Sequence, residues 1–318
     1  MQAGVTTYVL RRLLLMLPVA FLVTVGVFML IHLTPGDPAL ILLGEDRSPL
    51  AIADIHRQLG LDKPIYIQYV IWLGRIAHGD FGRSITTHQP VSAAITERLP
   101  ATLELGIVAL VWSLLVAIPL GTIAAVRRGS ALDYLATGIT VAGVSLPNFF
   151  IGVVLIFVLS VTFRLFPFGG YIPFAQDPIE SIRHVVLPAI ALGTAGAAIN
   201  MRFTRSSMIE VLNYDYVRTA WAKGASWRRV IFIHALKNAL IPVVTIVGLQ
   251  IGGIIEGAVV TETVFTWPGV GRLAVESISD RDYTVVQGIV LLAAFSYMFA
   301  NLLVDLVYGW LDPRISYA

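Results

Sequence analysis

The chain of 318 residues is 57% hydrophobic and only 13% charged, with a mean hydropathy of +0.80. Because soluble globular domains carry about 25% charged residues, this composition excludes that class and indicates a polytopic membrane protein. The net charge of +2 does not indicate a nucleic-acid partner, and the absence of cysteine from the sequence excludes disulfides, thiolate metal sites and cysteine nucleophiles.

Apolar runs of the length of a membrane helix occur six times along the chain. A bilayer core needs about 20 apolar residues per helix. The six runs lie near residues 13–33, 105–126, 135–163, 185–201, 239–260 and 285–310. We therefore expect an all-α polytopic membrane protein with six transmembrane helices.

The first run follows Arg11 and Arg12 and could be a secretory signal peptide. It is longer than the roughly 7–15 apolar residues of such a peptide. No small-residue cleavage site follows it before Pro35. We therefore expect residues 1–34 to form an N-terminal segment with an uncleaved first transmembrane helix.

Residues 35–100 separate the first and second runs and carry six Lys/Arg together with several acidic residues. Loops longer than about 60 residues escape the charge rule for membrane topology, so parity places this segment outside. A structureless loop of this length is unusual, and we expect part of it, including a helix-like patch at 50–59, to fold against the outer membrane face. It is either a landing surface for an extracytoplasmic partner or a solvated connector.

Residues 101–318 are expected to form the core domain, with a basic loop at about 202–238. This loop has seven Lys/Arg between Arg202 and Lys237 against two acids. The positive-inside rule therefore places it in the cytoplasm. The same orientation, with both termini cytoplasmic, is favoured by further basic residues at Arg11, Arg12, Arg127, Arg128 and Arg314.

The middle of this loop, residues 216–224, is typical of a short helix that ends at a glycine. A second basic helical segment, residues 227–237, leads into the fifth run. Two surface helices of this kind would present aromatic and basic side chains to the cytosol. Since aromatic residues and arginine are enriched in interface cores, the loop is a candidate protein-docking surface.

At these residues the chain resembles permease subunits of ATP-binding-cassette importers, specifically the first-permease type of the dipeptide and oligopeptide branch. In that family a loop motif forms the coupling helix: Glu-Ala-Ala, three residues, Gly, nine residues, Ile-x-Leu-Pro. Aligned on Gly224, this chain has Arg218-Thr219-Ala220 and His234-Ala235-Leu236-Lys237 at the two ends, so it keeps one alanine and the leucine. Its version, Tyr-Val-Arg-Thr-Ala-Trp-Ala-Lys-Gly followed by His-Ala-Leu-Lys-Asn-Ala-Leu-Ile-Pro, is similar to that of the peptide branch.

The resemblance extends over nearly the whole chain. It includes Arg11-Arg12-Leu13-Leu14, Pro35-Gly36-Asp37-Pro38, Gly79-Asp80-Phe81-Gly82-Arg83-Ser84, Leu99-Pro100-Ala101-Thr102-Leu103-Glu104-Leu105, Pro147-Asn148-Phe149 and Leu311-Asp312-Pro313-Arg314. It implies a type I importer permease in the plasma (inner) membrane of a prokaryote, working by alternating access. The ATPase-coupling helix would comprise Asp215, Tyr216, Val217, Arg218, Thr219, Ala220, Trp221, Ala222, Lys223 and Gly224.

The implied partners are a homologous second permease, one or two ATP-binding subunits and an extracytoplasmic solute-binding protein, with a heterodimer expected and a homodimer left open. The sequence lacks the Gly-x-x-x-x-Gly-Lys-Ser/Thr loop that holds nucleotide phosphates. It also lacks the His-Glu-x-x-His and Gly-x-Ser-x-Gly motifs of metal and serine hydrolases. We therefore expect no catalytic residue, metal or cofactor in this chain, with ATP and Mg²⁺ used by the partner ATPases.

Polar residues within the apolar runs are candidates for the translocation path. These are Asn148, Asn200, Gln250 and Glu256. An intramembrane carboxylate is costly and by default indicates a functional site, although Glu256 could instead lie hydrated at the outer interface. For Glu104 and Asp305 we expect structural pairing or capping.

Peptides are the expected solute, with nickel complexes, glutathione and other small solutes of the same family as alternatives. A stand-alone secondary transporter or channel would show internal repeats or broken helices around a mid-membrane site, and the sequence contains no convincing repeat. A membrane enzyme would need a paired catalytic constellation, which the sequence does not contain.

Overall fold

The fold was obtained as a computed structural model that describes residues 2–33, 48 and 62–311. Every named element among these residues is helical, and an isolated antiparallel bridge joins Arg83 to Pro90. The predicted all-α class is confirmed. Three stretches of the sequence to which expectations were attached, residues 35–38, 50–59 and 312–314, lie outside the described residues.

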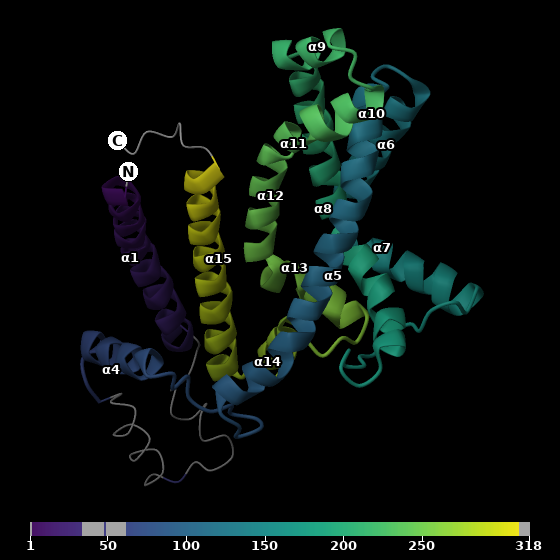
Figure 1. The fold of residues 1–318 in the computed structure, drawn as a ribbon. Helices are drawn as coiled ribbons and strands as arrows, with labels where there is room; N and C mark the ends of the chain where they lie inside the picture. Colours follow the sequence, from purple (N-terminus) through teal and green to yellow (C-terminus); the bar gives the residue numbers. More distant parts are fainter. Residues whose placement is uncertain (1, 34–47, 49–61, 312–318) are drawn as a thin grey trace.

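The first and last long helices, α1 (Gln2–Leu33) and α15 (Tyr283–Leu311), lie side by side and run in opposite directions (Figure 1). Gln287 Nε2 donates to the Val27 carbonyl at 2.8 Å, and Arg12 forms an ion pair with Asp305 at 2.8 Å. The predicted structural pairing of Asp305 is therefore confirmed. The start of α1 and the end of α15 lie at one end of the molecule, which we call the inner end because α9 lies there too.

The core is built on α5 (Val91–Val126) and α8 (Pro178–Leu212), which pack along each other. Small residues allow their backbones to approach closely. A Cβ on Gly193 would overlap the carbonyl of Ala109, and a Cβ on Gly121 would overlap that of Met201. Both helices extend beyond the predicted apolar runs, and α5 continues through Pro100 instead of beginning near residue 105.

The third predicted run is a bent pair and not one continuous helix. Helix α6 (Ala131–Ser145) is followed by α7 (Asn148–Leu155) and the π-helical segment η1 (Ile156–Thr162), at an angle of 104°. Leu146 is extended (ψ 128°) because the ring of Pro147 disfavours helical geometry in the residue before it. After this bend α7 runs sideways from the α5–α8 pair (Figure 1).

The loop after α8 and the fifth predicted run consist of several short helices. In chain order they are α9 (Asp215–Ala222), α10 (Trp227–Arg229), the π-helical η2 (Val230–Ala235), α11 (Leu236–Ala239), α12 (Ile241–Gly252) and α13 (Ile254–Val264). The prediction of one continuous helix at 239–260 is therefore wrong. The chain bends by 48° between residues 239 and 241, where α12 begins with Pro242 in its first turn, and breaks again at Gly253.

Four helices are long and apolar enough to cross a membrane, and the number reaches six when each bent pair counts as one span. The four are α5, α8 and the apolar parts of α1 and α15. The bent pairs are 131–162 and 227–252. This range of four to six is compatible with the predicted six spans within the described residues.

The outer end, opposite α9, carries α4 (Ile65–Ala77), the loop 78–90 and α14 (Val270–Ser279) (Figure 1). The carboxylate of Asp282 is buried and holds this loop. It accepts hydrogen bonds from Ser84 Oγ at 2.5 Å, the Ile85 amide at 3.0 Å and Thr86 Oγ1 at 3.2 Å. Asp282 thus connects the segment before α5 to the start of α15.

Replacing Asp282 with alanine should release the loop 84–90, because three donors lose a charged acceptor worth roughly 1.5–3 kcal/mol each. We expect a lower apparent melting temperature in detergent and faster tryptic cleavage after the exposed Arg83. Asp280→Ala is the matched control, since Asp280 is an exposed neighbour. Equal melting and cleavage of the two variants would contradict this role of Asp282.

Candidate functional site

The first candidate site is the helix α9 at the inner end, at the place predicted for the docking helix. It spans Asp215–Ala222, and Gly224 after it has a positive φ of 78°. Such a left-handed residue at a helix end is most easily a glycine. The predicted short helix that ends at a glycine is confirmed, and so is the following helical segment, which starts at Trp227.

One side of α9 is fixed to the body of the protein. Val217 is fully buried in a hydrophobic cluster with Met208 of α8 and residues of the segment before α12, namely Val230, Ile231, Ala235 and Ala239. Ala220 is partly buried against the same cluster. These contacts hold the helix across the inner ends of α8 and α11.

The other side of α9 is exposed and mixes aromatic and charged groups. Exposed residues of the predicted coupling helix are Asp215, Tyr216, Arg218, Thr219, Trp221, Ala222, Lys223 and Gly224. Trp221 is 44% exposed, and Trp227 in the next helix is 52% exposed. Arg228 and Arg229 add two further exposed cations. An exposed aromatic and arginine-rich surface has the composition of an interface core.

The second candidate site is a pocket of about 260 Å³ between α5, α7, α8, α12 and α13. Its polar lining residues are Ser113, Asn148 and Gln250. Glycines form much of the remaining wall, at Gly106, Gly193, Gly196, Gly253 and Gly257. Among the described residues, none of those that line the pocket is charged. Two of the helix breaks border it, since Asn148, directly after Pro147, and Gly253 are lining residues.

An amide cluster supports one wall of this pocket. Asn200 is fully buried, and its Nδ2 donates to Ser113 Oγ at 3.1 Å and to Gln250 Oε1 at 3.0 Å. Gln250 Nε2 returns a longer contact of 3.4 Å to Asn200 Oδ1. The structure therefore brings three of the four path candidates to one place, with Asn148 and Gln250 lining the pocket and Asn200 behind Gln250.

Glu256, the fourth candidate, does not line this pocket. Its side chain is exposed on α13 beside Gly257. Its predicted role on the path stays a prediction.

The most buried carboxylate in this region belongs to Glu262, which sequence reasoning missed. Its side chain is fully buried and accepts hydrogen bonds from Thr102 Oγ1 at 2.6 Å and from the Arg272 amide at 2.9 Å. Thr102 Oγ1 in turn accepts from the Val270 amide at 2.8 Å. Glu262 thus joins the ends of α13 and α14 to α5.

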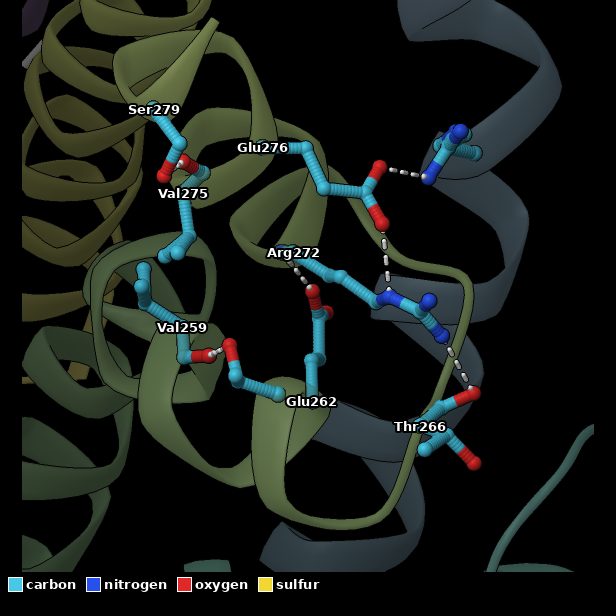
Figure 2. A network of polar contacts seen from close by, with 9 residues as sticks. Val259, Glu262, Thr266, Arg272, Val275, Glu276 and Ser279 are labelled. Carbon is cyan, nitrogen blue, oxygen red and sulfur yellow. Dashed lines mark hydrogen bonds and ion pairs between the residues drawn. The ribbon is translucent and has the colours of Figure 1, made fainter.

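The Arg272 guanidinium extends this network, as Figure 2 shows. It donates to Glu276 Oε1 at 2.8 Å and to the Thr266 carbonyl at 3.0 Å. Glu276 also pairs with Arg98 of α5 at 3.1 Å. Thr266 has a positive φ of 51°, which is strained for a β-branched residue, so the surrounding contacts must hold the turn in place.

Glycine is required beside Glu262 because the chain passes very close to its carboxylate. A Cβ on Gly269 would overlap the Glu262 carboxylate, and one on Gly271 would overlap the backbone of Val259. The signal available in the sequence is an acidic residue near the end of an apolar segment, Glu262, followed within one short turn region by the run Trp267-Pro268-Gly269-Val270-Gly271.

Glu104 is paired, as predicted. It accepts from Tyr171 Oη at 3.1 Å and from Ser181 Oγ at 2.9 Å. Burial, together with the neighbouring Glu104 carboxylate, raises the pKa of Tyr171 to about 12. Tyr171 therefore stays a neutral donor at physiological pH and connects the loop before α8 to α5.

Comparison with known families gives two matches that together span most of the chain. Residues 117–317 match the family described as binding-protein-dependent transport system inner membrane component. Residues 5–106 match the N-terminal family of the same transport-system membrane components. The first match alone covers more than half of the chain.

Individual relatives are similar over nearly their whole length. The chain is 43% identical to the dipeptide transport system permease protein DppB of Escherichia coli K12, covering 98% of each chain. It is 43% identical to the DppB protein of Alkalihalophilus pseudofirmus, covering 98% of this chain and 99% of the relative. Against the glutathione transport system permease protein GsiC of Escherichia coli K12 the identity is 42%, over 98% and 99% of the two chains.

Replacing Gly269 with alanine should destabilise the protein by about 1–3 kcal/mol, because the new methyl group must displace the buried carboxylate of Glu262. The apparent melting temperature in detergent measures this. Gly253→Ala is the matched control, since its nearest neighbour would be the Gln250 carbonyl at 3.8 Å and its φ is negative. A Gly269→Ala variant as stable as Gly253→Ala would contradict the proposed close approach.

Proposed function

Since the chain belongs to the family of binding-protein-dependent transport system inner membrane components, we propose that it is a permease subunit of an ATP-driven importer of short peptides. The observation that carries the substrate class is 43% identity to a dipeptide permease over 98% of both chains. The glutathione permease among the relatives is named for a tripeptide, so this similarity also favours short peptides.

The energy for transport comes from partner ATPases, which use ATP and Mg²⁺, because the sequence has no phosphate-binding loop of its own. They dock on the exposed side of α9, at Arg218, Trp221 and Lys223. This assignment is supported by the match of 216–224 to the coupling motif of the peptide branch and by the exposed aromatic and basic surface.

The inner end of the molecule is the cytoplasmic end. The basic residues of the 202–237 loop support this orientation through the positive-inside rule. The start of α1 and the end of α15 lie at this end as well, which supports cytoplasmic termini. The outer end, with α4, the loop 78–90 and α14, then receives the solute-binding protein.

The glycine-walled pocket forms this subunit's part of the translocation path, and a homologous second permease supplies the rest. Neutral amides can replace part of the hydration of a peptide without holding it too tightly. Because the lining described here carries no charge, it does not select for the charge of the peptide side chains. Selection among peptides is then left to the binding protein.

Cells that lack this gene should lose uptake of labelled dipeptides and tripeptides, and the gene should restore it. Uptake should also stop when ATP is depleted, since the transport is driven by hydrolysis. If the deletion strain takes up peptides as before but no longer takes up nickel complexes or another small solute, that solute would be the substrate instead of peptides. Peptide uptake that persists without ATP would favour a secondary transporter.

The same cells test the pocket. Gln250→Leu should reduce the restored uptake, because it removes a polar group from the lining and leaves Asn200 without one partner. Gln176→Leu, at an exposed position of the loop before α8, is the control. Full restoration by Gln250→Leu would exclude this pocket from the path.

A further inference from the structure

Tyr216 belongs to the predicted coupling helix, but its hydroxyl is bonded to the body of the protein. It donates to the His234 carbonyl at 3.2 Å and accepts a hydrogen bond from Asn238 Nδ2 at 2.7 Å. Asn238 Nδ2 also contacts the His234 carbonyl, at 3.3 Å. Three groups from α9, η2 and α11 thus meet at one point.

The position of this contact in the chain is informative. His234 lies in the π-helical segment η2, and π-helical turns occur frequently at functional sites. Asn238 lies in α11, two residues before Leu240, where the chain bends by 48° into α12. Helix α12 then continues to Gln250, which lines the pocket. A displacement of α11 would therefore reach a pocket wall through α12.

The hydroxyl contact of Tyr216 is directional, unlike the hydrophobic packing of the buried Val217. Hydrophobic packing is non-directional, so the buried Val217 holds α9 against the body but specifies its orientation less narrowly than a hydrogen bond does. Hydrogen bonds weaken steeply as their geometry departs from linear. The Tyr216 contacts therefore fix how α9 is oriented relative to α11.

A neighbouring tyrosine makes a different contact and provides an internal comparison. Tyr214 donates from its hydroxyl to Glu210 Oε1 at 2.7 Å, which lies in α8 only four residues earlier in the chain. Tyr214 and Tyr216 are similarly exposed, at 44% and 41%. The Tyr214 contact is local, whereas that of Tyr216 links α9 to the segment that leads into the fifth span.

We propose that Tyr216 and Asn238 are positioning residues that couple movement of α9 to α12 and hence to the pocket. The inference rests on the function proposed above and deepens it. The Tyr216 hydroxyl contacts the body of the permease and does not belong to the surface that contacts the ATPase. Asn238, which lies outside the predicted coupling helix, completes the link.

The test uses the complete transporter, with both permeases, ATPases and binding protein, in proteoliposomes supplied with ATP and a labelled dipeptide. Tyr216→Phe and Asn238→Ala should each lower the amount of dipeptide transported per ATP hydrolysed, on the order of fivefold, the effect of one net hydrogen bond. The ATPase subunits should co-purify at the wild-type level. The double variant should fall no further than the more severe single variant, because both changes remove one shared contact.

Tyr214→Phe is the matched control and should transport as the wild type does. A ratio of transport to hydrolysis in Tyr216→Phe equal to that in Tyr214→Phe would overturn the inference. Loss of co-purified ATPase from Tyr216→Phe with an unchanged ratio would also overturn it, since Tyr216 would then belong to the docking surface. If the Tyr216→Phe transporter does not assemble, the same ratio of transport to hydrolysis is measured for Asn238→Ala. A wild-type ratio for that variant would overturn the inference. A wild-type transporter without ATP-dependent dipeptide uptake would refute the proposed function itself and this inference with it.

Discussion

The close approach of α5 and α8 is the constraint on which the rest of the structure depends. At Gly193 and Gly121 the two backbones lie so near each other that a single methyl group would not fit. In a membrane there is little hydrophobic gain from joining two helices, so such packing of small residues carries the association. The pair forms one wall of the pocket through Gly193, Gly196 and Ser113, and its inner end supports α9 through the cluster around Val217.

The turns at the outer end and the helix α9 at the inner end are held by different contacts. At the outer end the buried carboxylates of Glu262 and Asp282 accept several hydrogen bonds each: Glu262 joins α5 to α13 and α14, and Asp282 joins the loop before α5 to the start of α15. At the inner end α9 is held by apolar packing and by the contact between Tyr216 and Asn238. Removing a partner from a buried charge costs more than breaking one neutral hydrogen bond. The inner end also contains a buried carboxylate, Asp133 of α6, which pairs with Arg205 of α8 at 2.6 Å. Helix α9, held by packing and neutral hydrogen bonds, is therefore the part of the inner end that a partner can move at lower cost.

The sequence predicted the helical class and the approximate places of the membrane runs, because apolar length is a local property. It also predicted the Gly224 helix end and the pairing of Glu104 and Asp305. The bend at Pro147 was readable in principle, since proline restricts the residue before it. The role of Glu262 was not, because its burial depends on Thr102, which lies 160 residues away in the chain. The inward contacts of Tyr216 likewise depend on how α9 and α11 pack, which no local pattern encodes.

We propose that an ATPase subunit contacts this permease at α9, and cross-linking tests this contact most directly. The sequence has no cysteine, so Ala222→Cys introduces a single exposed thiol on α9. With a thiol-reactive photo-cross-linker in membranes that contain the whole transporter, we predict a product with an ATPase subunit that changes in yield when ATP is bound. Thr87→Cys, exposed at the outer end, should give no such product. Absence of an ATPase product from Ala222→Cys, or an equal yield from Thr87→Cys, would contradict this account.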